Sequence, residues 1–425
     1  MSLLADLTST LFDQRYVPFR RWAKDGRKID ELCRDLLTSK GEVTGQTLAG
    51  MILTSYATLS DAQKLDFFRF LDTEMDIDPE KLRFALERYS QSRDPKTYRD
   101  LMHEVEPRRQ ELARRMNQVP GATHQLVQMR CDLIDFLAEH PELTKLDMDF
   151  RHLFASWFNR GFLVLRPINW ESPAHILEKI IEYEAVHAIH SWEDLRRRLR
   201  PQDRRCFAFF HPAMPDEPLI FVEVALTKGI PNSIQAVLAE EREVLEAREA
   251  DTAVFYSISN CQKGLAGISF GNSLIKQVAD DLSRQLSGLK TFVTLSPVPS
   301  LMTWLKAEGL DGQVDNPDRL RALTARYLVE EKRGNGSPKD PVARFHLNNG
   351  AMLHDVHAGA DTSPNGQARS AGAMVNYLYD LSRVARNHEA YAGQKQVVAS
   401  SQVQALVRQA TSKAEQTRRG EESRA

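Results

Sequence analysis

The feature that most constrains the fold is a strand, a glycine-rich turn, a helix and a second strand in succession. The first strand reads TAVFYSIS (252–259) and the second KTFVTLSPVPS (290–300). An amphipathic helix is expected between them, at about 272–287, with Ile275 on its apolar face. Because a helical crossover of this length joins parallel strands, the segment predicts a parallel pair within one sheet.

The turn carries Gly264, Gly267 and Gly271 ahead of the helix. A helix N-terminus offers unpaired N–H groups and partial positive charge, and glycines let an anion approach the backbone closely. The pattern therefore favours phosphate binding, although it lacks the Gly-Lys-Ser/Thr ending of a Walker A loop and the Rossmann spacing. An ordinary tight turn with a packing glycine is the alternative interpretation.

The rest of the chain divides into a helical part and a mixed part. Up to about residue 160 the apolar spacing and a capping box at Ser60–Gln63 predict helices. Strands are then expected at 162–170 and, as a hairpin-like pair, at 204–212 and 217–229. The expected fold class is mixed α/β (α+β). The predicted domains are 1–160 (helical), 161–411 (mixed sheet) and 412–425, a polar tail expected to be disordered.

Composition excludes several classes of protein. The 425 residues include 56 basic and 58 acidic side chains, and this balance favours neither nucleic acid nor an anionic membrane as a partner. No apolar run is long enough to span a bilayer. Four scattered cysteines without C-x-x-C spacing argue against a disulfide framework or a zinc ribbon. With Asp6 and Asp13 in the N-terminal segment, a cytoplasmic location is expected.

Four ordered segments closely resemble the malonyl-CoA decarboxylase family. They are FFHPAMPDEPLIFVEVALTKGIPNSIQAVL (209–238), AVFYSISNCQKGLAGISFGNSLIKQV (253–278), TLSPVPSLMTWL (294–305) and PVARFHLNNGAML (341–353). EAVHAIHSWEDLRRRL (184–199) is also similar, so the resemblance covers about 160–410. It implies a helical N-terminal domain followed by a GNAT-like, acyl-CoA-binding catalytic domain. It also implies conversion of malonyl-CoA to acetyl-CoA and CO₂ without metal, biotin or another prosthetic group, by a homotetramer that assembles through the helical domain.

The resemblance also implies which residues form the site. A serine in the Leu-Ser-Pro segment and a histidine in the Phe-His-Leu segment carry the chemistry, which places these roles on Ser296 and His346. The pantetheine and diphosphate of coenzyme A are expected along the glycine-rich turn and one helical turn beyond it. The residues concerned are Ala266, Gly267, Ile268, Ser269, Phe270, Gly271, Asn272 and Ile275. Gly264-Leu265-Ala266 fits the end of the GNAT diphosphate motif, but Cys261 stands where Gln or Arg is usual.

These residue types suit the reaction. Loss of CO₂ from a 3-carboxy thioester leaves an enolate, which needs hydrogen-bond donors and then a proton. Ser296 could orient the carboxylate or donate to the thioester oxygen. A histidine with an ordinary pKa of ~6.5 is suited to donate a proton near neutrality. The segment PVARFHLNN (341–349) is expected to be a strand with Val342, Arg344 and His346 on one face.

Other interpretations remain open. A GNAT fold usually transfers acyl groups, so an acyl-CoA-dependent acyltransferase is one rival, and a non-catalytic acyl-CoA sensor is another. Ser257 and Ser259 are candidates for ligand contacts or for strand capping. His354-x-x-His357 could suggest a metal site, but surface polar residues are the favoured interpretation. The arginines between 196 and 205 could meet a coenzyme A phosphate or another subunit, with a solvated helix end favoured.

Overall fold

The computed structural model describes residues 26–39, 41–268 and 274–422, with only the backbone of 274 and 412–422. These residues form two compact units. The first comprises the described chain up to Val164 together with 210–219 and 262–268, and the second comprises the remainder. Because two short later segments belong to the helical unit, the units do not coincide with consecutive stretches of sequence. The predicted domain limits therefore stay a prediction.

The first unit is helical. Its α-helices are α2 (Ile29–Thr38), α3 (Glu42–Tyr56), α4 (Asp61–Thr73), α5 (Pro79–Gln91), α6 (Pro95–Val105), α7 (Arg108–Met116), α8 (Ala122–Phe136) and α9 (Thr144–Trp157). Ser60 caps α4 with the predicted capping box to Gln63. Asp78 and Asp94 cap α5 and α6, each followed by proline at the first helical position. Local sequence thus starts these helices, and one apolar core packs α2, α3, α4, α7, α8 and α9 together, while α5 and α6 contact each other.

The second unit contains an eight-stranded mixed sheet. Its strands are β1 (Val164–Ile168), β2 (Arg204–Phe210), β3 (Ile220–Thr227), β4 (Thr252–Asn260), β5 (Thr291–Thr294), β6 (Ser296–Pro297), β7 (Met352–His357) and β8 (Met374–Leu378). The strand order is β1-β2-β3-β4-β5-β8-β6, with β7 pairing to β8. β2, β3 and β4 are antiparallel, whereas β4 and β5 are parallel. The predicted hairpin and the predicted parallel pair are both confirmed.

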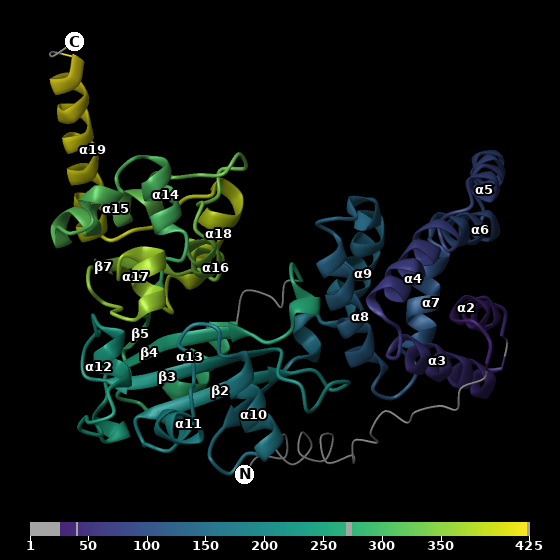
Figure 1. Cartoon of the computed structure of the whole chain (residues 1–425), viewed down its shortest axis with the longest axis horizontal. Coiled ribbons are helices and arrows are strands. Elements are labelled where there is room, and N and C mark those ends of the chain that lie inside the picture. The colour runs from purple at the N-terminus through teal and green to yellow at the C-terminus, as the bar shows by residue number, and fades with distance from the viewer. Residues whose placement is uncertain (1–25, 40, 269–273, 423–425) are drawn as a thin grey trace. The chain divides into compact units, whose positions relative to one another are not determined.

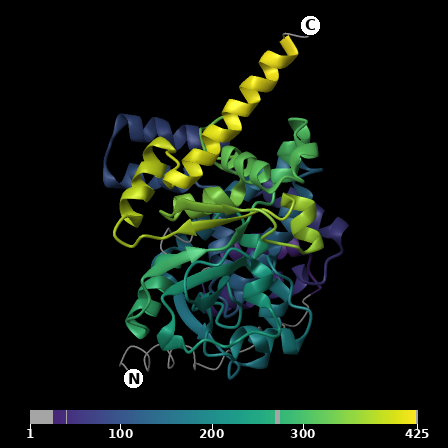
Figure 2. The same ribbon diagram turned by 90° about the vertical axis from the view of Figure 1, so that its left-hand side faces the viewer.

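Helices flank this sheet. They are α10 (Ala174–Tyr183), α11 (Trp192–Leu199), α12 (Ile234–Leu238), α13 (Leu274–Gln285), α14 (Leu301–Ala307), α15 (Pro317–Glu330), α16 (Pro341–Asn348), α17 (Pro364–Ser370), α18 (Val384–Gln394) and α19 (Ser401–Glu422). Figure 1 shows α10 and α11 on one side of β2 and β3. Near the C-terminus, α15 and α19 pack against each other and against β7, and Figure 2 shows α19 projecting from this unit. The mixed α/β fold class is confirmed.

Two predictions about local structure meet a different outcome. The segment PVARFHLNN is the helix α16 and not a strand, because Asp340 accepts a hydrogen bond from Ala343 N at 2.8 Å and Pro341 begins the helix. The backbone of α19 continues to Glu422, through most of the segment for which disorder was expected. Within the described residues, no helix is long and apolar enough to cross a membrane.

Candidate active site

A cavity forms in the second unit where its two parallel strands part. β4 and β5 pair from Thr252 to Phe255, after which β4 continues to Asn260 while the other chain turns into β6. A register shift between β3 and β4 at this point leaves Tyr256 as an extra residue in β4. The cavity measures about 250 Å³. Its lining is Val186, Phe255, Tyr256, Ile258, Asn260, Ser296, Pro297, Pro341, Val342, Phe345 and His346.

The two residues predicted to carry the chemistry meet in this cavity. Ser296 lies on β6 and His346 in the last turn of α16, and Ser296 Oγ is 3.0 Å from His346 Nε2. Both side chains are buried. Fifty residues of sequence separate them. Their catalytic roles stay a prediction, but the geometry allows both to act on one ligand.

Further hydrogen bonds show which of the two side chains donates the hydrogen bond between Ser296 and His346. Ser296 donates its hydroxyl to Thr294 Oγ1 at 2.8 Å, so the hydrogen that links Ser296 to His346 comes from Nε2. Nδ1 is then the acceptor, and it lies 2.9 Å from the Tyr379 hydroxyl. Burial raises the pKa of Tyr379 well above its ordinary value, so this hydroxyl keeps the hydrogen that it donates. The chain of donors therefore runs from Tyr379 through His346 and Ser296 to Thr294.

Burial also decides the charge of the histidine. It lowers the pKa of His346 from its ordinary value to about 3, because the imidazolium would lose its hydration without a carboxylate nearby. The ring stacks on that of Tyr377, with centroids 4.4 Å apart. The expectation of a histidine with an ordinary pKa is thus not met, because burial keeps His346 neutral at pH 7.

Sequence reasoning missed three residues around this pair. Thr294 stands two residues before Ser296 and accepts a hydrogen bond from its hydroxyl. Tyr377 stacks on the ring of His346, and the Tyr379 hydroxyl is hydrogen-bonded to its Nδ1. The available signal was the spacing of two residues between 294 and 296 and between 377 and 379, which in a strand places both side chains of each pair on one face. The spacing does not show which partner that face meets.

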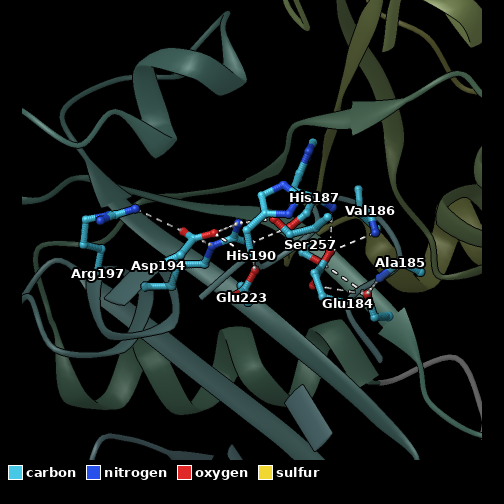
Figure 3. Close-up of polar contacts among 12 residues, drawn as sticks. Glu184, Ala185, Val186, His187, His190, Asp194, Arg197, Glu223 and Ser257 are labelled. Carbon is cyan, nitrogen blue, oxygen red and sulfur yellow. Dashed lines mark hydrogen bonds and ion pairs between the residues drawn. The ribbon is translucent and has the colours of Figure 1, made fainter. Parts of the chain in front are cut away.

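A second buried polar cluster supports one wall of the cavity (Figure 3). Glu184 accepts hydrogen bonds from the Ser257 hydroxyl at 2.7 and 2.9 Å and from the N–H groups of Val186 and His187 at 2.8 and 2.7 Å. The Ser259 hydroxyl lies 3.4 Å from the same carboxylate. Neither serine lines the cavity, so both hold Glu184 and the segment after it, which carries the cavity-lining Val186.

The basic run between 196 and 205 is not simply a solvated helix end. Arg198 is buried between His187 O, at 2.8 Å, and Glu223 Oε2, at 3.2 Å. Arg204 is also buried and donates to Val237 O at 2.5 Å. Burial and the nearby Glu184 raise the pKa of Glu223 to about 8. At least two of the arginines therefore hold the unit together and do not face a ligand.

His354 and His357 are the pair whose spacing could suggest a metal site. Both lie on the strand β7, where His357 Nε2 is 2.5 Å from Asn376 Oδ1. In the part of the chain that the structure describes, no three His, Cys, Asp or Glu side chains gather as a metal site.

The glycine-rich turn is described only in part. Ala266, Gly267 and Ile268 belong to the first unit and Ile275 to the second, while Ser269–Asn272 lie outside the described residues. A side chain at Gly264 would collide with Val127 O, which would lie 2.0 Å from its Cβ. That glycine is thus required for close packing against α8, whereas the coenzyme A contacts predicted along the turn stay a prediction.

The second unit is thus defined by a mixed sheet in which two parallel strands part beside a cavity with a buried Ser–His pair. Comparison with known proteins identifies the family. The family description "Malonyl-CoA decarboxylase N-terminal domain" matches residues 76–158, and "Malonyl-CoA decarboxylase C-terminal domain" matches 161–317 and 313–417. The chain therefore belongs to the malonyl-CoA decarboxylase family.

Individual relatives agree with this assignment. "Malonyl-CoA decarboxylase, mitochondrial" of Anser anser anser is 36% identical over 356 residues, which cover 71% of this chain and 70% of the relative. The protein of the same name from Mus musculus is 34% identical, and the match covers 73% of each chain. Two solved structures, malonyl-CoA decarboxylases from Rhodopseudomonas palustris and Agrobacterium vitis, are each 48% identical with TM-scores of 0.84. They cover 88% and 89% of this chain, and 98% and 99% of their own.

Proposed function

We propose that this chain is a carboxy-lyase that converts malonyl-CoA to acetyl-CoA and CO₂. The observation that carries the proposal is the buried pair of Ser296 and His346, 3.0 Å apart on the wall of one cavity. The chain's membership of the malonyl-CoA decarboxylase family and the names of its relatives support malonyl-CoA as the substrate. Fold alone would leave the reaction open.

The cavity suits the first step, the loss of CO₂. The bond between the α-carbon and the carboxyl carbon breaks, and its electron pair becomes an enolate with charge on the thioester oxygen. The Ser296 hydroxyl donates to Thr294 and His346 Nε2–H to Ser296, and either hydrogen would turn to this oxygen when the substrate is bound. One such preorganised donor typically stabilises the transition state by ~3–4 kcal/mol. Ser296 could instead orient the departing carboxylate, and both roles remain part of the proposal.

The charge of the cavity favours the same step. Among the described residues that line it, none is lysine or arginine, and burial lowers the pKa of His346 so that the ring is neutral. A carboxylate among such side chains is poorly solvated, whereas CO₂ is uncharged. The lining therefore favours the product over the bound carboxylate.

His346 would supply the proton for the second step. A malonyl carboxylate beside the ring favours the imidazolium, so the histidine takes up a proton from solvent as the substrate binds. It then gives this proton to the α-carbon of the enolate and returns to the neutral form. Tyr379, 2.9 Å from Nδ1, can accept a hydrogen bond from the imidazolium as well as donate to the neutral ring. The net reaction consumes one proton for each CO₂.

One assay separates this proposal from its rivals. Purified protein is incubated with malonyl-CoA after EDTA and avidin treatment, and acetyl-CoA and CO₂ are measured. Equal amounts of both products support a decarboxylase that needs neither metal nor biotin. Transfer of the acyl group to an added amine without CO₂ would identify an acyltransferase. Tight binding without any product would identify an acyl-CoA sensor.

Two finer expectations belong to the same proposal. We expect a cytoplasmic location, as the sequence analysis predicts. The animal relatives are named mitochondrial, so fractionation of the native cells decides this point.

We also expect a homotetramer assembled through the helical unit. The helices α5 and α6 lie side by side and expose large apolar side chains. These are Phe84, Leu86, Tyr98, Met102 and Val105, which are 60%, 51%, 53%, 50% and 43% exposed. Apolar residues gathered on neighbouring helices are typical of a contact surface, and a second copy of the chain is the occupant that the family resemblance implies.

A further inference from the structure

We propose that the helical unit binds the diphosphate of coenzyme A through Arg151 on α9 and the backbone N–H of Gly267. The inference rests on the proposed function and extends it, since coenzyme A was expected at the turn but no side chain of the helical part was assigned to it. Both residues lie within the first unit.

Residues Leu265–Ile268 form a type II turn. Ala266 has φ −55° and ψ 131°, Gly267 has φ +78°, and Ile268 N donates to Leu265 O at 3.0 Å. The third position of a type II turn requires positive φ, which is why glycine occupies it. The peptide bond between Ala266 and Gly267 thus has a fixed orientation.

Arg130 fixes which way this peptide points. Its buried guanidinium donates to Ala266 O at 3.0 Å and to Gly264 O at 2.7 Å, and Asp147 accepts from its Nε at 2.8 Å. Because a trans peptide directs its C=O and its N–H in opposite directions, Gly267 N–H points away from Arg130. In the described part of the chain this N–H has no acceptor. The turn therefore presents a free donor on the side opposite the buried arginine.

A cation lies beside this donor. The guanidinium of Arg151 rests against Gly267, with Nη2, Cζ and Nε 3.2, 3.4 and 3.5 Å from the position that a Cβ would occupy. Arg151 is exposed, and no acidic group pairs with it among the described residues. By contrast, Arg130 is paired with Asp147, and Lys263 with Asp135. Arg151 thus gives the turn an uncompensated positive charge.

A backbone N–H and a guanidinium together match the chemistry of a phosphate group. The guanidinium can form two parallel hydrogen bonds to phosphate oxygens, and the N–H adds a third donor of fixed direction. Glycine is required at 267 for two reasons, because the positive φ and the nearby guanidinium each disfavour a side chain there. Arg130 acts as a positioning residue, and Arg151 is the residue that contacts the ligand.

Calorimetry with three ligands tests this site. Full-length Arg151→Ala is titrated with coenzyme A, with dephospho-coenzyme A, which lacks only the 3′-phosphate, and with pantetheine, which lacks all phosphates. Loss of a charge-assisted contact should weaken binding of the first two about 10-fold or more and leave pantetheine unchanged. Arg151→Lys should retain part of the affinity, because the charge remains without the planar fork. Arg108→Ala, another exposed arginine of the same unit, is the matched control and should bind like the wild type.

Each result bears on the inference separately from the proposed function. If coenzyme A binds folded Arg151→Ala as tightly as the wild type, the site is refuted even when malonyl-CoA is decarboxylated. If Arg151→Ala weakens coenzyme A but not dephospho-coenzyme A, the contact is with the 3′-phosphate and the diphosphate assignment is wrong. If the predicted pattern appears but malonyl-CoA releases no CO₂, the phosphate site stands and the decarboxylase proposal fails.

Discussion

His346 is a histidine that burial keeps neutral until a ligand arrives. Its ring lies between Tyr377, Tyr379 and Ser296, and none of these groups supplies the negative charge that would stabilise an imidazolium. The lowered pKa, about 3, follows from this arrangement. Since the proposed reaction needs an acid, the substrate carboxylate must raise the pKa of His346 enough for the ring to take up a proton from solvent. This links protonation of the histidine to substrate binding.

Replacing the histidine should therefore stop turnover while sparing binding. In His346→Gln we expect kcat for malonyl-CoA to fall ~10²–10⁴-fold, the usual loss when general acid catalysis is removed. The affinity for acetyl-CoA should change little, because that ligand has no carboxylate that would favour the imidazolium. Steady-state kinetics and calorimetry on one preparation measure both quantities. A folded variant with near-normal kcat would remove His346 from the mechanism.

The same histidine should make the fold sensitive to acid. Its pKa is about 3 when folded and ~6.5 when unfolded, so between these values the unfolded chain binds more protons. The free energy of unfolding should accordingly fall as the pH falls through this window, by roughly 2 kcal/mol for this group between pH 6.5 and pH 5. Urea unfolding of the wild type and His346→Gln at both pH values isolates the effect. A stability difference between the two proteins that does not change with pH would show that His346 is not buried as a neutral ring.

At the scale of elements, α16 is the helix that presents the cavity wall and the histidine together. Pro341, Val342 and Phe345 line the cavity from its first turns, and His346 follows. Asp340 caps this helix from a fully buried position, and burial raises the pKa of its carboxyl to about 6. A buried acid at the start of α16 thus fixes the backbone on which the reactive ring depends.

Removing this cap should affect catalysis as well as stability. For Asp340→Ala we expect a loss of ~0.5–2 kcal/mol in the free energy of unfolding, as for other N-caps. We also expect a lower kcat, because the helix that holds His346 loosens. Ser363→Ala is the matched control, since Ser363 caps α17 by the same bond, to Gly366 N at 3.0 Å, and α17 does not line the cavity. If the two variants have similar melting temperatures and only Asp340→Ala has a lower kcat, the positioning role is supported. Equal kcat values in the two variants would contradict it.

At the scale of the whole molecule, local patterns predicted the elements and long-range contacts decided their use. The strand–turn–helix–strand segment was predictable because periodicity and glycines are local signals. The strand predicted at 341–349 was wrong because the Asp340–Pro341 pair is a helix start signal, which overrides the alternation at Val342, Arg344 and His346. The contacts of His346 with Ser296 and Tyr379 join three separate segments, so no local pattern could reveal them.

Buried charges were the least predictable part. Arg198 stands in a run of arginines that composition assigns to solvent, yet it pairs with Glu223 on a central strand. Glu184 resembles any helix-end glutamate, but it accepts hydrogen bonds from Ser257 and from two N–H groups. A charged residue is buried only when its partners are in place, and those partners are known only once the sheet is assembled.

Assembly is the property of the whole molecule that remains to be tested. If copies of the chain associate through the exposed apolar face of α5 and α6, a charge placed there would have to be buried without a partner. Phe84→Glu combined with Met102→Glu should thus lower the mass measured by light scattering from that of a tetramer to a smaller species, while circular dichroism keeps the helical content. Val43→Glu is the control, because Val43 is 80% exposed on α3, outside this face. A double variant that keeps the mass of the wild type would show that α5 and α6 do not hold the copies together, and a monomeric wild type would refute the tetramer itself.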